Sequence, residues 1–66
     1  MAIKVRSLNG KIYTLDQNRV KVKELFKILG LLSEEYIVVK NGRILTEEDE
    51  IVDGDEVVLY PVVSGG

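Results

Sequence analysis

The 66-residue chain contains no cysteine and no histidine. Without cysteine there is no disulfide and no thiolate ligand for a metal ion. Without histidine, the commonest metal ligand and general base is missing. A chain this short buries only about 60% of its unfolded surface and is marginally stable without such supports. Its stability must therefore come from the packing of its apolar residues, which make up 45% of the sequence.

The sequence also lacks a long apolar segment and a strong excess of either charge. Its longest apolar run, residues 57–63, is too short for a signal peptide or a membrane-spanning helix. The net charge is −2, and the nine lysines and arginines form no stripe of the kind that binds nucleic acid. We therefore expect one soluble, cytoplasmic domain that binds neither membrane nor nucleic acid directly.

No set of side chains in the sequence is typical of an enzyme active site. There is no nucleophile–base pair, no glycine-rich phosphate loop and no metal-ligand spacing. The carboxylate pairs Glu47/Glu48 and Asp53/Asp55 lie in predicted turns, with no predicted apolar pocket to raise a pKa. The acidic stretch 47–56 is typical of a solvated turn, and a surface for a basic partner is the alternative. We interpret the protein as a non-enzyme that acts as a substrate or partner of enzymes and binds no cofactor itself.

Alternating apolar residues and turn-forming pairs predict a β-sheet. Ile3 and Val5 point to one face of the first strand, and Asn9-Gly10 predicts a type I′ hairpin turn after it. Asn41-Gly42 predicts a second tight turn in the middle of the chain. The predicted strands are residues 2–8, 11–15, 36–40, 43–45 and 56–63.

One amphipathic helix is predicted between the second and third strands. Val22, Leu25, Phe26 and Leu29 are spaced as one apolar face of a helix. Gly30 is a natural left-handed terminator at its end. No capping residue precedes Val22, so the helix start is weakly defined by the sequence.

The remaining segments are predicted to be connections, 16–19 and the acidic 46–52 with Ile51 as its one apolar anchor. Because the last strand is apolar at nearly every position, we expect it to be central and to lie beside the first strand. Pro61 lacks an N–H, so the strand ladder should end near it. The order of elements predicts an α+β fold, a mixed sheet of four to five strands with one packed helix. The predicted core is Ile3, Val5, Tyr13, Leu15, Val22, Leu25, Phe26, Leu29, Val38, Leu45, Val57 and Leu59.

The sequence ends in Ser64-Gly65-Gly66, directly after the apolar run. Glycine has no side chain, so such a segment can enter a channel too narrow for a Cβ and present only the carboxylate of Gly66. Two terminal glycines also arise by chance, as a frayed solubilising end. We expect residues 1–63 to form the domain and residues 64–66 to be a flexible tail.

These features resemble the ubiquitin-like β-grasp sulfur carriers and modifiers, namely ThiS, MoaD and the small archaeal modifier proteins. The resemblance covers nearly the whole chain and is most specific over residues 53–66, a turn, a last strand and a di-glycine end. Residues 40–43 are similar to the mid-chain hairpin of the family, and residues 8–15 to the first hairpin of ubiquitin. The ending 59–66 is MoaD-like, the length is close to ThiS, and the compact form with this ending is most similar to the archaeal modifiers.

The resemblance implies a β-grasp fold and a carrier chemistry. An activating enzyme would use ATP and Mg²⁺ to adenylate the Gly66 carboxylate, with Ser64 and Gly65 in its channel. The acyl group would then become a thiocarboxylate, or pass to a lysine of a target protein. The sulfur would serve a synthase or a tRNA thiolase, in tRNA thiolation, molybdopterin synthesis or thiamine thiazole synthesis. Three functions remain open: a sulfur carrier, a protein modifier joined by isopeptide bond, and a β-grasp binding module with an inert tail.

The resemblance also implies a docking face for the activating enzyme. It directs Val57 and Leu59 inward, so the opposite side chains of the last strand point outward, with Lys11 and Arg43 at the rim. An exposed apolar cluster usually marks an interface, and tyrosine is a favoured anchor. The alternative is that Tyr60 only covers the sheet. The predicted docking residues are Leu8, Val39, Val58, Tyr60 and Val62.

Overall fold

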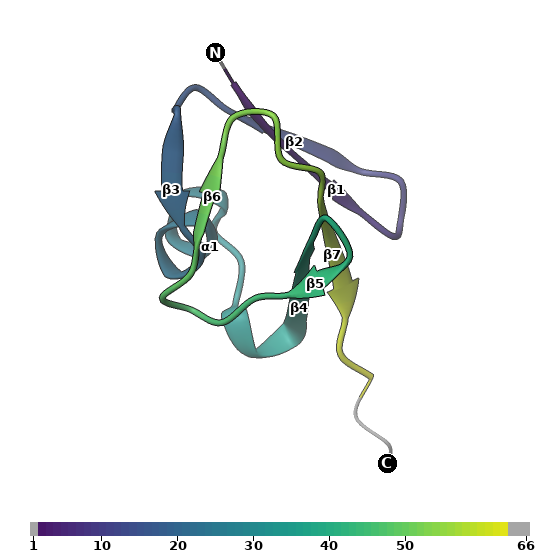
Figure 1. Cartoon of the computed structure of the whole chain (residues 1–66). Coiled ribbons are helices and arrows are strands. Elements are labelled where there is room, and N and C mark those ends of the chain that lie inside the picture. The colour runs from purple at the N-terminus through teal and green to yellow at the C-terminus, as the bar shows by residue number, and fades with distance from the viewer. Residues whose placement is uncertain (1, 64–66) are drawn as a thin grey trace.

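A computed structural model describes residues 2–63, which form a five-stranded sheet, a two-stranded sheet and one α-helix (Figure 1). The elements are β1 (Ile3–Ser7), β2 (Ile12–Leu15), β3 (Arg19–Lys21), α1 (Val22–Leu29), the 3₁₀ helix η1 (Ser33–Glu35), β4 (Tyr36–Lys40), β5 (Arg43–Ile44), β6 (Glu50–Val52) and β7 (Val57–Pro61). The predicted tail, residues 64–66, lies outside the described residues.

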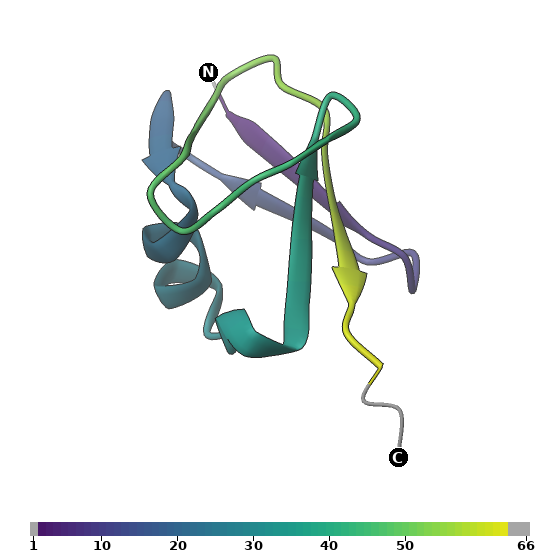
Figure 2. The same ribbon diagram turned by 60° about the horizontal axis from the view of Figure 1, so that its bottom comes forward.

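The last strand, β7, lies in the middle of the larger sheet, whose order is β2-β1-β7-β4-β5. It pairs in parallel with β1 and antiparallel with β4, so the sheet is mixed. The predicted central position of this strand beside the first one is confirmed. The helix α1 covers one face of the sheet (Figure 2). A hairpin, a packed helix and a last strand inserted beside the first define the α+β class and the β-grasp fold.

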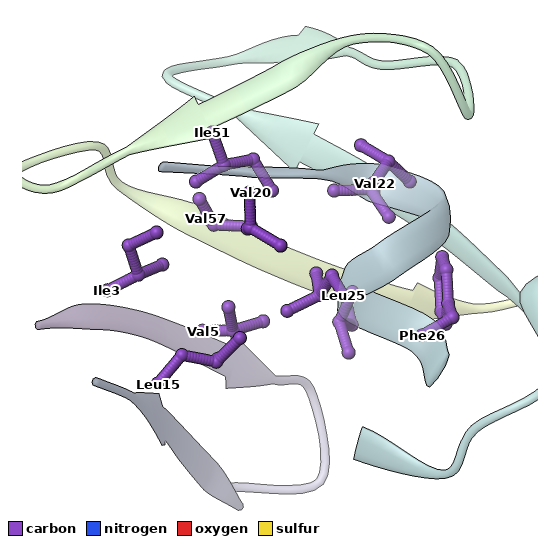
Figure 3. Packing of buried hydrophobic residues seen from close by; sticks show 11 residues of the cluster. Ile3, Val5, Leu15, Val20, Val22, Leu25, Phe26, Ile51 and Val57 are labelled. Atoms are coloured by element: carbon purple, nitrogen blue, oxygen red, sulfur yellow. The ribbon is translucent and has the colours of Figure 1, made fainter. Parts of the chain in front are cut away.

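The core lies between the inner face of the sheet and α1, where apolar side chains from both point toward one another (Figure 3). Tyr13, Leu29 and Leu45 are only partly buried, although they pack against this cluster. The other predicted core residues are buried. The buried cluster is Ile3, Val5, Leu15, Val20, Val22, Leu25, Phe26, Val38, Ile51, Val57 and Leu59.

Two short strands, β3 and β6, form a separate antiparallel pair beside α1 that the sequence did not predict (Figure 1). Val20 and Ile51 face each other across this pair and are 3% and 0% exposed. The interpretation of residues 46–52 as a plain connection was therefore wrong, as was the omission of both residues from the core. Each strand has three residues with only the middle one buried, so the period-2 pattern is too short to recognise.

The turn at Asn9-Gly10 is not the predicted type I′ turn. The Gly10 N–H donates to the Ser7 carbonyl (3.0 Å), and the Ser7 N–H donates to the Lys11 carbonyl (2.8 Å). Within residues 2–63, Asn41 is the one non-glycine residue with positive φ, so Asn9 does not have the positive φ that type I′ requires. The loop has three residues and ends on Gly10 at φ 92°. The Asn9 side chain stabilises this form by accepting the Lys11 N–H (2.9 Å).

The helix α1 presents the predicted apolar stripe to the core, with Val22, Leu25 and Phe26 buried. It ends as predicted at Gly30, which is left-handed with φ 71°. The Phe26 ring stacks on Tyr36 with 6.2 Å between ring centroids, so it joins the helix to the start of β4. No helix among residues 2–63 has the length and apolar character needed to cross a membrane.

The start of α1 is capped by backbone and not by a side chain. Lys21 makes no capping hydrogen bond, as its residue type predicts. Instead the Val22 N–H donates to the Asp49 carbonyl (3.0 Å), and the Lys23 N–H donates to the Glu47 carbonyl (3.1 Å). Residues 46–49 therefore form a capping loop, which satisfies N–H groups that would otherwise lack acceptors within the helix.

Replacing Phe26 by alanine should lower the free energy of unfolding by about 3–5 kcal/mol, because it removes a large buried ring from the core and with it the Tyr36 contact. Urea unfolding followed by circular dichroism measures this loss. Ile28→Ala is the matched control, since Ile28 lies on the same helix but is 50% exposed. Equal stability of Phe26→Ala and the wild type would show that the helix register is wrong.

Candidate functional site

The two sides of β7 differ as the family resemblance implied. Val57 and Leu59 are buried under α1, whereas Val58 is half-buried and Tyr60 is 39% exposed on the other side of the sheet. The inward and outward directions predicted for these four residues are confirmed. The strand therefore contributes to the core with one face and to the molecular surface with the other.

Cross-strand register gathers apolar side chains on the outer side of the sheet. Val58 of β7 lies between Arg6 of β1 and Val39 of β4. Val39 in turn pairs with Ile44 of β5, which is 68% exposed. On the far side, Arg6 pairs with Ile12 of β2, so a basic side chain interrupts the row there.

A second row lies next to the first, toward the carboxyl end of β7. Tyr60 pairs with Ile37 of β4, and the Leu8 N–H donates to the Leu59 carbonyl (3.2 Å), which holds Leu8 beside Tyr60. We call the apolar residues of both rows the outer apolar face. It consists of Leu8, Ile37, Val39, Ile44, Val58 and Tyr60.

Four of the predicted docking residues, Leu8, Val39, Val58 and Tyr60, are thus brought together on one face. Ile37 and Ile44 belong to the same face, and sequence reasoning missed them. The available signal was parity, because Ile37 must point away from a buried Val38. The two-residue strand β5 gives no such pattern for Ile44.

The fifth predicted docking residue, Val62, lies beyond the end of β7 and is 48% exposed. Its N–H donates to the Glu35 carbonyl of η1 (2.9 Å), so it remains attached to the domain beside the outer apolar face. β7 ends at Pro61, as predicted for the end of the ladder. Ser64, Gly65 and Gly66, for which we predicted the carrier chemistry, lie outside the described residues.

Exposed basic side chains lie around the outer apolar face. Lys4 and Arg6 project outward from β1. The predicted rim residue Arg43 pairs with Lys40 and therefore lies on the opposite side of the sheet from the neighbouring outward pair, Val39 and Ile44. Arg6 is 3.8 Å from Glu56, and both side chains are well exposed. Exposed pairs of this kind contribute little to stability, so the Arg6 guanidinium remains free to change partners.

The carboxylate of Asp55 has a structural role in the turn before β7. It accepts the Val52 N–H (2.8 Å) and the Asn41 amide (3.4 Å), and it lies 3.4 Å from the Lys40 ammonium. Burial of the carboxyl favours its neutral form, but the Val52 N–H and Lys40 outweigh this and lower the pKa of Asp55. Asn41 also accepts the Glu56 N–H (3.0 Å), so the mid-chain hairpin and this turn are fixed to each other.

The other acidic residues of this region also stabilise local structure. Glu48 lies 3.2 Å from Lys23 and 3.5 Å from Lys21, and its hydrogen bond with Lys23 is the main cause of its lowered pKa. Asp49 accepts the N–H (2.8 Å) and the hydroxyl (3.1 Å) of Thr46, which lower the pKa of Asp49. Residues 2–63 contain no group of acidic side chains placed to hold a metal ion. These contacts give the acidic stretch a structural role, as the capping loop, the strand β6 and the turn before β7.

The mixed sheet with its central last strand, the single packed helix and the outer apolar face define a small ubiquitin-like protein. The family model described as ThiS matches residues 4–66, and the chain therefore belongs to the ThiS family. Proteins of this family are small sulfur carriers rather than enzymes, and they interact with activating enzymes and with sulfur-accepting partners. The predicted membership among the ubiquitin-like sulfur carriers is confirmed at this level.

Asp55→Asn should make folding stability less dependent on pH. Because the pKa of Asp55 is lowered in the folded chain, its stabilisation is complete above the unfolded pKa of about 3.9 and is lost as the pH falls through the folded pKa. At pH 7 the variant should be less stable by about 1–2 kcal/mol, since the charged acceptor for Val52 is gone.

Urea unfolding of both proteins from neutral to acidic pH measures the difference. The difference in the free energy of unfolding should disappear in acid, where Asp55 is protonated. Asp53→Asn in the same turn is the control, because within residues 2–63 its side chain makes no hydrogen bond, and its effect on stability should be small. A constant difference for Asp55→Asn would contradict the role assigned to the charge.

Proposed function

We propose that the protein carries sulfur as a thiocarboxylate on Gly66. The observation that carries this proposal is the ThiS match, which extends through residue 66 and so includes the Gly65-Gly66 pair. A carboxylate is an anion at neutral pH and resists attack by a nucleophile. An activating enzyme would join it to the α-phosphate of ATP with the help of Mg²⁺ and release pyrophosphate. A sulfur nucleophile would then displace AMP from the acyl-adenylate and leave the thiocarboxylate.

The outer apolar face is the proposed docking surface for the activating enzyme. It includes Val58 and Tyr60 of the same strand that leads toward Gly66, so a partner bound there would hold the origin of the tail at a fixed place. The partner should present an apolar centre with acidic groups at its edge, opposite Lys4 and Arg6. Each of these rim pairs should contribute only about 0–1 kcal/mol.

The thiocarboxylate would then donate its sulfur to an acceptor enzyme. A synthase for molybdopterin or for the thiamine thiazole and a tRNA thiolase are the candidate acceptors. The need for ATP agrees with a cytoplasmic location, which is part of the proposal. Joining Gly66 to a lysine of another protein would use the same adenylate, so the modifier function is an outcome that the experiments must distinguish.

Incubation with the activating enzyme of the source cell, ATP, Mg²⁺ and a sulfur donor should replace one oxygen of the protein by sulfur. Intact-mass spectrometry detects the difference between the two atoms. Gly65→Val should be activated far more slowly while it remains folded, because a branched side chain would enter the narrowest part of the proposed channel. Ser64→Ala, which adds no bulk, is the control and should be activated normally.

The outcomes of this experiment separate the three functions. An unchanged mass of the wild type would contradict the carrier proposal, and a ladder of lysine conjugates in cells would support the modifier function. If removal of Gly65-Gly66 changed no cellular activity, the tail would be inert. A normal rate of AMP transfer to Gly65→Val would contradict the narrow channel.

Tyr60→Ala should weaken binding to the activating enzyme by about 2 kcal/mol or more if the ring is an anchor. The loss of folding stability should be much smaller, since Tyr60 is 39% exposed. Isothermal titration calorimetry measures the affinity. Ile28→Ala is the matched control, because it removes a 50% exposed apolar side chain from α1 and not from the outer face of the sheet. Wild-type affinity of a folded Tyr60→Ala variant would remove this face from the docking proposal.

A further inference from the structure

Within residues 2–63, a single backbone hydrogen bond attaches the residues after β7 to η1. The Val62 N–H donates to the Glu35 carbonyl (2.9 Å). In an antiparallel pair only every second residue bonds to the neighbouring strand, so the next bonding position before Val62 is Tyr60. Pro61 lies between them at a non-bonded position opposite Tyr36, and it has no N–H to donate.

Beyond Leu59, no backbone group among residues 2–63 pairs with the β1 side of β7. The last hydrogen bond from the β1 side is donated by the Leu8 N–H to the Leu59 carbonyl (3.2 Å), and β1 has already turned into its hairpin there. No residue among 2–63 accepts a hydrogen bond from the Val63 N–H, and Val63 is 84% exposed. Within the described part of the chain, one backbone hydrogen bond therefore holds everything after Tyr60.

The acceptor of this bond is itself well fixed. The Glu35 N–H donates to the Leu32 carbonyl (3.0 Å), which closes the turn of η1. The next residue, Tyr36, stacks on the buried Phe26. The Glu35 carbonyl is thus positioned by the core, whereas the donor, Val62, is 48% exposed. When the bond opens, we expect the Val62 side to move and the Glu35 side to remain in place.

We propose that the hydrogen bond from Val62 to Glu35 is a tether that sets the reach of the carrier end, with Val62 as a positioning residue. This inference rests on the proposed activation of Gly66. With the tether closed, the last hydrogen-bonded residue is Val62, and the four residues 63–66 can span at most about 14 Å. With the tether open, the last hydrogen-bonded residue is Tyr60, so residues 61 and 62 lengthen the reach by about 7 Å.

The tether matters because docking and chemistry take place at separate points. A partner that binds the outer apolar face holds Tyr60, and its adenylating centre must receive the carboxylate of Gly66. The closed tether fixes the distance between these points, and a tail that is one residue too short can reach the centre only if Val62 is released. Opening the tether should therefore compensate a shortened tail, which a merely stabilising hydrogen bond would not do.

The test removes the N–H of Val62 alone, by an amide-to-ester replacement at that position in a synthetic chain. The matched control is the same replacement at Val63. Each ester is made once in a chain with the full-length tail and once in a chain that lacks Ser64. ATP–pyrophosphate exchange by the activating enzyme gives kcat and KM for each chain. Deletion of Ser64 shortens the reach of the tail by about 3.5 Å, and it should lower kcat/KM at least about tenfold. The Val62 ester should recover about fivefold of this loss, and the Val63 ester should recover none.

Hydrogen exchange followed by NMR tests the tether in the isolated protein. After correction of both rates for sequence effects, the exchange rate of the Val62 amide should be at least about fivefold lower than that of the Val63 amide. Equal exchange at the two amides would overturn the tether, and so would a Val62 ester that lowers the activity of both tail lengths equally. If the wild type is not activated at all, the proposed function fails. If it is activated but the ester rescues nothing, only the present inference fails.

Discussion

The position of β7 in the centre of the sheet is the constraint on which the rest of the structure depends. This strand joins β1 to β4, and its inner residues Val57 and Leu59 are buried beneath α1. Because Val5 pairs with Val57, the sheet cannot close until residues from both ends of the described chain have met. Such distant pairing slows folding but gives a strand that is bonded on both sides and is among the last to open. Up to Leu59, β7 is therefore one of the most rigid parts of the molecule, whereas one backbone hydrogen bond holds the described chain beyond Tyr60.

Polar residues hold the rest of the fold to this centre. The Asp55 carboxylate and the Asn41 amide attach the mid-chain hairpin to the turn that leads into β7. The capping loop supplies backbone acceptors to the start of α1, where the sequence offers no capping side chain. Glu48 then bridges Lys21 and Lys23 across that contact. An acidic stretch that is typical of a solvated turn thus contributes directly to the helix and to the sheet.

The elements that could be predicted from the sequence are those whose pattern is long enough to be unambiguous. The helix stripe and the uniformly apolar last strand led directly to α1 and to the central place of β7. The pair β3–β6 could not be predicted, because Val20 and Ile51 are single apolar residues in charged surroundings. The Asn9-Gly10 turn was mistaken because the same dipeptide suits two loop types, and a contact from the Asn9 side chain to the Lys11 N–H accompanies the one adopted. At the candidate site, the sequence led to a hypothesis about Gly66 that remains a prediction. Only strand register could show that Ile37 and Ile44 adjoin the predicted docking residues.

In the proposed function, the composition of residues 64–66 explains why the protein needs a docking surface such as the outer apolar face. Two glycines and a serine offer little apolar surface to a partner, and glycine loses more conformational freedom on ordering than any other residue. Binding the tail alone would therefore cost nearly as much as its contacts contribute. In the proposed function, the affinity for an activating enzyme must therefore come from the domain, and the outer apolar face around Tyr60 lies on the strand that leads toward residues 64–66. Because Val57 and Leu59 alternate with Val58 and Tyr60, the inner side chains of one strand can stabilise the fold while its outer side chains provide the proposed contact area.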